Sequence, residues 1–158
     1  MTIPSRSGAS RPYAEVIGDP IAQSKSPRIH TFWLGKLGIA ADYRACHVQP
    51  QALPDYFAQR RADPAWRGCN ITMPHKQAAI ACLDGIDPLA GRIGAITTVV
   101  RSADGRLTGF NTDVAGFLEP LQPQLAEVHL YRMARILGSG GAARAIVAAL
   151  ADAKFTVV

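Results

Sequence analysis

A glycine-rich turn near the end of the chain restricts the fold more than any other stretch. Ile136 and Leu137 lead into Gly138-Ser139-Gly140-Gly141-Ala142, which is followed by an alanine-rich segment over 143–151 and an apolar one over 155–158. After a strand, closely spaced glycines let the backbone approach a pyrophosphate, which the N–H groups of the next helix then bind. The glycine spacing matches the usual pattern only in part, so a tight structural turn is the alternative. The stretch predicts a βαβ unit that binds a dinucleotide.

Upstream of this turn, short apolar segments alternate with amphipathic ones, which predicts an α/β fold with largely parallel strands. The expected elements are strands over 13–17, 42–48 and 68–72, helices over 28–37, 53–61, 74–83 and 88–92, a hairpin over 95–110 and a helix opening at 111–113.

These elements predict two domains. A mixed, mostly parallel α/β substrate domain is expected over 13–120, after a disordered tail over 1–12. The first βαβ unit of a Rossmann domain follows over 121–158. Because a first βαβ unit exposes apolar faces that later elements normally cover, we expect this domain to be incomplete and the chain to be truncated at its C-terminus.

The composition fits a packed protein and argues against several classes of function. Of the 158 residues, 48% are hydrophobic and 18% charged, which supports a core. The net charge of +5 is not gathered with aromatic residues into a nucleic-acid-binding surface. The three cysteines and four histidines have no metal-ligand spacing, so free buried thiols and no metal are expected. Without a signal peptide or a long apolar run, the chain is expected to be cytoplasmic and not to contact a membrane.

A lysine in an unfavourable position is the first candidate for chemistry. Lys76 follows Thr72, a suitable N-cap, and Pro74, which suits the first position of a helix. A cation there faces the positive end of the helix dipole, which lowers the cost of losing its proton. Asp113 is the candidate partner that would orient the lysine. The alternative is a solvated surface lysine without a role.

Two serines form a second candidate site. Ser24 and Ser26 stand two residues apart on the turn before the helix that Pro27 opens. Two hydroxyls beside free helix N–H groups make a cradle for a carboxylate. The alternative is that Ser26 merely caps the helix.

Taken in order, these stretches resemble the shikimate dehydrogenase family. The resemblance covers nearly all of residues 13–158. Its motifs are Gly18-Asp19-Pro20-Ile21-Ala22-Gln23-Ser24-Lys25-Ser26-Pro27 with His30, Asn70-Ile71-Thr72-Met73-Pro74-His75-Lys76, Gly94-Ala95, Gly109-Phe110-Asn111-Thr112-Asp113 with Gly116-Phe117, and Gly138-Ser139-Gly140-Gly141-Ala142.

The resemblance implies a reversible, NADP-linked hydride transfer between 3-dehydroshikimate and shikimate, a step of chorismate and aromatic amino acid biosynthesis. It implies that Ser24 and Ser26 hold the substrate carboxylate and that Thr72 contacts a ring hydroxyl. Lys76 would transfer the proton, with Asp113 as its partner at the ring hydroxyls. The hydroxyl proton must leave as hydride leaves the same carbon, and a lysine is a suitable acceptor.

Two departures from the family leave the substrate and the cofactor open. The family usually has an asparagine that contacts the substrate at the position of Thr97, which offers a hydroxyl in place of an amide. A changed hydrogen-bond partner alters discrimination strongly, so quinate, an aminoshikimate or another polyol acid is an alternative substrate. The loop that reads the ribose 2′-phosphate lies beyond the chain, so NAD is not excluded as the cofactor.

A protein of another class is also considered, namely a non-catalytic sensor that binds such acids. The presence of both Lys76 and Asp113 argues against a sensor, because binding alone does not require a proton-transfer pair. The expected partners are a small carboxylate substrate and the dinucleotide, in a monomer or a homodimer.

Overall fold

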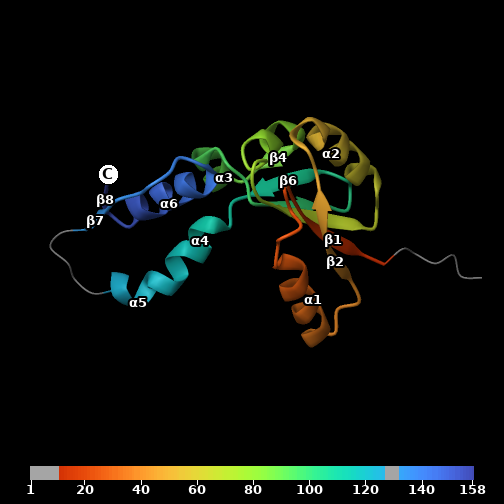
Figure 1. Cartoon of the computed structure of the whole chain (residues 1–158), viewed down its shortest axis with the longest axis horizontal. Coiled ribbons are helices and arrows are strands. Elements are labelled where there is room, and N and C mark those ends of the chain that lie inside the picture. The colour runs from red at the N-terminus through yellow and green to blue at the C-terminus, as the bar shows by residue number, and fades with distance from the viewer. Residues whose placement is uncertain (1–10, 127–131) are drawn as a thin grey trace, which may run out of the picture.

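The computed structural model describes residues 11–126 and 132–158, and in these ranges the chain forms two sheets of different size (Figure 1). The larger sheet has six strands in the order β2-β1-β3-β5-β6-β4, and the smaller one pairs β7 with β8. The predicted α/β class is confirmed. Of the predicted tail, residues 1–10 lie outside the described residues.

One half of the large sheet consists of three parallel strands. β1 (Tyr13–Gly18) pairs in parallel with β2 (Asp42–His47) on one side and with β3 (Trp66–Ile71) on the other. Parallel neighbours require crossover connections, which α1 (Ser26–Lys36) and α2 (Leu53–Ala62) provide. The carboxyl ends of β1 and β3 therefore meet at one edge of the sheet, where functional residues of α/β proteins commonly gather.

A hairpin extends the sheet on the other side. β5 (Thr98–Arg101) pairs antiparallel with β3 and with β6 (Leu107–Phe110), and β4 (Gly85–Ile86) runs parallel to β6. Gly68 makes the contact between β3 and β5 possible. Its φ is +152°, and a Cβ on it would lie 2.1 Å from the Val99 carbonyl oxygen.

The main core lies between the sheet and α2, whereas α1 projects from the opposite side, beside β1 and β2 (Figure 1). α2 buries Leu53, Tyr56 and Phe57, while α1 contributes no buried residue. The largest completely buried side chain is that of Trp66. A short 3-10 helix, η1 (Pro50–Ala52), leads into α2.

A second, smaller core joins the last helix to the rest of the chain. α6 (Gly141–Asp152) packs through Ala145 and Ala149 on Ile93, Ala95 and Val114. These partners lie on or beside α3 (Pro88–Ile93) and α4 (Asp113–Leu118). Small alanine side chains on α6 let the helices approach closely.

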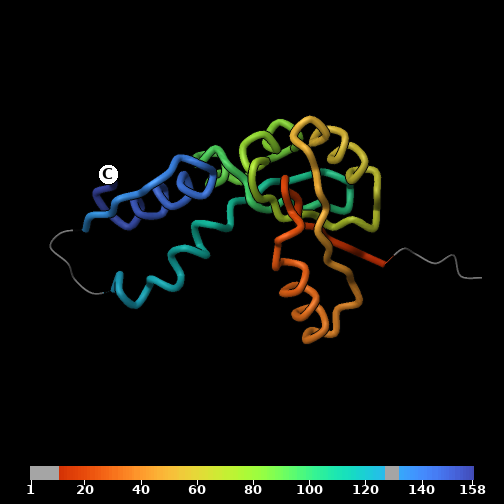
Figure 2. Tube along the Cα trace, in the orientation of Figure 1, coloured from red at the N-terminus to blue at the C-terminus, as the bar shows by residue number. Residues whose placement is uncertain are grey.

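The C-terminal part follows a chain path that Figure 2 traces from the hairpin through α4 and outward. η3 (Glu119–Leu121) and α5 (Gln122–Leu125) continue α4 where Pro120 and Pro123 interrupt a regular helix. The predicted parallel βαβ unit is confirmed, since β7 (Met133–Ala134) pairs in parallel with β8 (Thr156–Val157) around α6. Its first strand begins before the expected Ile136, whose N–H donates to the Val158 carbonyl at 2.9 Å.

Two local predictions are wrong. In place of a helix over 74–83, a series of turns leads into the 3-10 helix η2 (Ala78–Cys82). The Lys76 carbonyl accepts the N–H of Ile96 at 2.8 Å, so it is not free to continue a helix, and the dipole argument for this lysine fails. Ser26 is not a side-chain cap, because Lys25 occupies the cap position of α1 without a side-chain hydrogen bond.

The cysteines are free thiols, as expected. Cys69 is buried on β3, and Cys46 and Cys82 are half-buried. Burial raises the pKa of all three thiols. Over the described ranges, no helix has the length and apolar character needed to cross a membrane.

Candidate active site

The structure brings Lys76 and Asp113 together at the carboxyl edge of the large sheet. The Lys76 Nζ donates to Asp113 Oδ2 at 2.6 Å, across 37 residues of sequence. The lysine side chain is 16% exposed and the aspartate side chain 33%, so the pair is partly shielded but open on one side. A lysine in this contact is not a freely solvated surface residue.

The turn that carries Lys76 is held by its neighbours in sequence. The His75 side chain is buried, and its ring donates from Nε2 to the Val48 carbonyl at 2.6 Å. The Thr72 N–H donates to the Ile17 carbonyl at 3.0 Å, which ties the turn to the end of β1. Together with the bond from Ile96, these contacts fix the backbone of Lys76 on both sides.

The turn that carries Asp113 is held by Asn111, a buried residue whose role was not predicted from the sequence. Its side-chain amide donates to the Ala95 carbonyl at 2.9 Å, and its Oδ1 accepts the Asp113 N–H at 3.0 Å. The second bond is an Asx turn, in which an asparagine binds the backbone two residues on. The Asn-x-Asp spacing was the signal in the sequence that could have predicted this role.

Thr97 supports the same turn. It is 5% exposed, and its Oγ1 accepts the Thr112 N–H at 2.8 Å and lies 2.9 Å from the Thr112 hydroxyl oxygen. The hydroxyl predicted to contact substrate is therefore already engaged within the protein. Thr112 itself is exposed, and its hydroxyl also lies 3.4 Å from that of Thr98.

Ser24 lies on the loop after β1, beside the lysine turn, and Ser26 is the first residue of α1. The Ser26 N–H donates to Ser24 Oγ at 3.3 Å. The Asp19 N–H donates to the Met73 carbonyl at 3.0 Å, so the start of this loop runs along the turn after β3. Thr72 lies at the same place, because a Cβ on Gly18 would come within 2.6 Å of its Cγ2.

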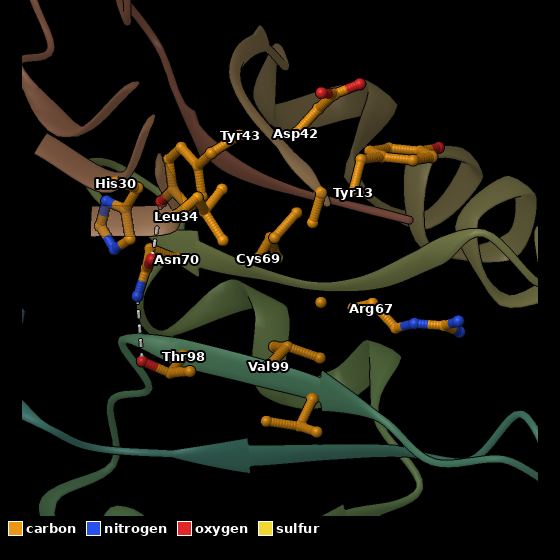
Figure 3. Close-up of a pocket in the computed structure, with 14 residues that line it drawn as sticks. Tyr13, His30, Leu34, Asp42, Tyr43, Arg67, Cys69, Asn70, Thr98 and Val99 are labelled. Carbon is orange, nitrogen blue, oxygen red and sulfur yellow. Dashed lines mark hydrogen bonds between the residues drawn. The ribbon is translucent and has the colours of Figure 1, made fainter. Parts of the chain in front are cut away.

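A mostly apolar pocket of about 360 Å³ lies between α1 and the sheet (Figure 3). Three polar side chains that line it form a hydrogen-bond network that the sequence did not predict. The Tyr43 hydroxyl donates to Asn70 Oδ1 at 2.6 Å, and the Asn70 amide donates to the Thr98 hydroxyl at 3.1 Å. The His30 ring stacks on Tyr43 at 3.9 Å, and burial raises the pKa of Tyr43. The network reaches Thr112 through Thr98.

The glycine turn lies at the start of α6, a helix of 12 residues. Gly138 has φ +125°, and Cβ atoms placed on Gly138 and Gly140 would meet nothing within 4 Å, so the backbone is open to a ligand. Arg144 lines an adjacent groove of about 550 Å³ with Ser139 and Arg92. Exposed backbone N–H groups and arginines are the donors that phosphates require, so these residues fit the pyrophosphate of a dinucleotide.

The turn also touches the lysine. A Cβ on Gly141 would lie 3.0 Å from both Cβ and Cδ of Lys76. The predicted cofactor turn and the predicted proton-transfer residue are thus in direct contact.

The fold and the site define a class of α/β proteins in which a mixed sheet with a lysine–aspartate pair at its edge is followed by a βαβ unit with a glycine turn. Residues 16–99 match the family model described as the shikimate dehydrogenase substrate binding domain. The chain belongs to the shikimate dehydrogenase family.

Individual relatives cover most of this chain. A shikimate dehydrogenase (NADP(+)) from Sphingopyxis alaskensis is 57% identical over 90% of the chain and 51% of its own length. The structure of the Thermus thermophilus shikimate 5-dehydrogenase with NADP(H) and shikimate has a TM-score of 0.82 at 44% identity, covering 92% of this chain and 54% of that one. A ligand-free 5-ketofructose reductase from Gluconobacter sp. strain CHM43 has a TM-score of 0.79 at 34% identity, with 92% and 51% covered.

The chain spans about half the length of the curated relatives that it matches.

Proposed function

We propose that the protein is an NADP-dependent shikimate dehydrogenase, which catalyses reversible hydride transfer between 3-dehydroshikimate and shikimate. The observation that carries this proposal is the Lys76–Asp113 pair, 2.6 Å apart, in contact with the glycine turn of a chain of this family. Residues 13–120 would form the substrate domain and 121–158 the start of the cofactor domain. NADP, when bound at the glycine turn, would accept the hydride.

The substrate would lie over the edge of the sheet. Ser24 and Ser26 would hold its carboxylate with hydroxyl and backbone donors, while Thr72 would contact a ring hydroxyl. These residues follow the carboxyl ends of β1 and β3, at the edge of the sheet where the turn of Lys76 also begins. Thr97 stays a proposed substrate residue, with a hydroxyl already bonded to Thr112.

Lys76 would transfer the proton. When shikimate is oxidised, its hydroxyl oxygen loses a proton as the carbon loses hydride, and the lysine amine accepts that proton. In the reverse direction the lysine ammonium returns the proton to the carbonyl oxygen. Asp113 would orient the lysine through the observed hydrogen bond and accept a hydrogen bond from a neighbouring substrate hydroxyl.

Another polyol substrate is the second candidate, and a reductase of 5-ketofructose among the structural relatives favours keeping it. Quinate or an aminoshikimate would require the same carboxylate cradle and proton transfer. The remaining features of the proposal are NADP in preference to NAD, a cytoplasmic enzyme, and a monomer or homodimer that contacts neither nucleic acid nor membrane.

The test is an assay of the full-length enzyme that follows the absorbance of NADPH with 3-dehydroshikimate, with NADH and with quinate plus NADP or NAD in parallel. Turnover with 3-dehydroshikimate and NADPH at the highest kcat/KM supports the proposal. Tight binding of shikimate without turnover of any substrate would identify a sensor instead. Higher kcat/KM with quinate would identify the second candidate.

The role of Lys76 is tested by Lys76→Ala, which should lower kcat by about 10²–10⁴-fold because the proton acceptor is lost. Lys36→Ala is the matched control, since Lys36 lies at the exposed end of α1 and should leave kcat unchanged. Full kcat in Lys76→Ala would refute the catalytic role.

A further inference from the structure

The side chain of Lys76 is confined at three places. Asp113 holds its Nζ, and the hydrogen bond from Ile96 holds its backbone carbonyl. Between these ends, the aliphatic stem lies against the backbone of Gly141. The first two contacts belong to the substrate part of the chain, whereas the third belongs to the turn that is proposed to bind the cofactor.

The contact with Gly141 is closer than a side chain would allow. A Cβ on this residue would lie 3.0 Å from two carbons of the lysine stem and 3.5 Å from the Ala95 Cβ. Carbon atoms in contact prefer separations of about 3.5–4.0 Å, so an alanine here would push the stem away. The φ of Gly141 is not in the left-handed region, so the backbone itself does not require glycine.

The neighbouring glycine provides a contrast. A Cβ on Gly140 would meet no atom within 4 Å, and the space beside it is open to a ligand. Gly140 therefore faces the proposed cofactor position, while Gly141 faces the lysine. Two adjacent glycines of one turn are small for different reasons.

Packing of α6 sets the position of Gly141. Ala145 and Ala149 pack one and two turns further along the same helix, in the core that includes Ala95. Arg92 pairs with Asp152 at the other end of α6, at 2.5 Å. Gly141 is thus the first residue of a helix that is packed at both ends. Its backbone therefore has a fixed position against which the lysine stem can pack.

We propose that Gly141 is a positioning residue for Lys76. Its missing side chain lets the lysine stem lie against the cofactor turn, which directs the Nζ toward Asp113 and the substrate. The turn that holds the dinucleotide thereby also sets the geometry of proton transfer. This inference rests on the proposed function for its catalytic consequence, but the contact itself does not.

The first experiment compares Gly141→Ala with Gly140→Ala in the full-length enzyme. Gly141→Ala should lower kcat by about tenfold or more and displace the pH profile of kcat, because small misplacements of a catalytic group are costly. Its Kd for NADP, measured by calorimetry without substrate, should stay within about threefold of wild type. Gly140→Ala should raise that Kd and leave the pH profile of kcat in place. Gly91→Ala, whose Cβ would also meet nothing within 4 Å, is the control with unchanged activity.

The second experiment needs no turnover. A double-mutant cycle combines Gly141→Ala with Lys76→Gly, which removes both contacting carbons, and compares Tm values. Alanine is the better helix former, so Gly141→Ala should raise Tm when the lysine stem is absent and lower it when the stem is present. A Gly141→Ala variant too unstable to assay is still read by this cycle, because the double variant should recover stability.

The outcomes are distinguishable. Equal Tm shifts in both backgrounds, or a Gly141→Ala enzyme with a raised Kd and an unchanged pH profile, would overturn the inference and leave the proposed function intact. If wild type turns over no shikimate-type substrate while the cycle still shows coupling, the proposed function and the catalytic part of the inference fail. The contact between Gly141 and Lys76 then stands alone as a structural feature.

Discussion

Two ion pairs in this protein join residues that are far apart along the chain, and they differ in how completely their hydrogen bonds are filled. Glu15 is 2% exposed, and both of its carboxylate oxygens accept from Arg60, at 2.7 and 3.1 Å. The Tyr56 hydroxyl adds a third bond at 2.8 Å. Lys76 and Asp113 share one bond, and among the described residues neither side chain makes another.

The difference separates a closed pair, Glu15 with Arg60, from an open pair, Lys76 with Asp113, and the open pair is the one for which we propose a catalytic role. A buried charge must have its hydrogen bonds satisfied, and the two N–H donors of the Arg60 guanidinium do this for Glu15. The hydrogen bond to Glu15 in turn raises the pKa of Arg60. Both oxygens of the buried Glu15 carboxylate are occupied by Arg60 and Tyr56, so a ligand has no group to bind there. Lys76 keeps two donors and Asp113 one oxygen free, which fits the proposal that this pair binds hydroxyls of the substrate.

The largest effect on stability is expected from breaking the closed pair. Arg60→Met should lower the free energy of unfolding by about 3–5 kcal/mol, because Glu15 stays buried with one partner gone. Lys76→Met, the matched change in the open pair, should cost less than about 1 kcal/mol, because that pair is partly hydrated. Urea unfolding of both variants measures the contrast. Equal losses of unfolding free energy would show that the two pairs contribute equally to stability and would contradict the contrast.

A smaller effect is expected at Thr97, which supports the open pair. Thr97→Val keeps the shape but removes the acceptor of the Thr112 N–H, and should cost about 0.5–1.5 kcal/mol in unfolding free energy. It should also lower kcat/KM, since the turn that carries Asp113 loosens. Thr97→Ser keeps the hydroxyl and is the control. If Val and Ser behave alike in both measurements, the hydroxyl has no positioning role.

The smallest effect is expected at alkaline pH and concerns the buried tyrosines Tyr13 and Tyr56. Burial and the hydrogen bond to Asp63 raise the pKa of Tyr13 to about 12, and burial also raises the pKa of Tyr56. Because the pKa of Tyr13 is higher in the folded than in the unfolded state, the stability that Tyr13 contributes is complete below about pH 10 and is lost as pH rises toward 12. Urea midpoints between pH 8 and 11 should fall at the upper end. Tyr13→Phe should flatten the fall, and an unchanged slope would contradict the assignment.

The fold was predictable where local pattern decides it. Apolar periodicity and proline or glycine boundaries predicted α1, α2, α3, the hairpin and the βαβ unit around α6. The helix over 74–83 was not correctly predicted, because a hydrogen bond from Ile96 removes the Lys76 carbonyl from the helical pattern. A bond between residues 20 positions apart leaves no trace in local propensity.

The site was predictable in its residue types but not in its contacts. The motifs pointed to Lys76 and Asp113, which the structure joins. The hydrogen bonds between Thr97 and Thr112, and the contact of the Lys76 stem with Gly141, depend on how segments distant in sequence pack together. The pairing of β5 with β6 brings Thr97 to Thr112, whereas the packing of α6 on α3 and α4 brings Gly141 to Lys76. Sequence spacing carries no information on the second of these contacts.

The stretch Ala95–Thr97 has a consequence for how this protein can vary. Its three residues bind the turns of Lys76, Asn111 and Thr112 by backbone and side chain together. An inserted residue would shift all of these bonds at once, whereas a substitution alters one. Length should therefore be constant in this stretch across the family, with new substrate preferences arising by replacement of side chains. The largely exposed turn at 102–106 of the same hairpin is free to lengthen.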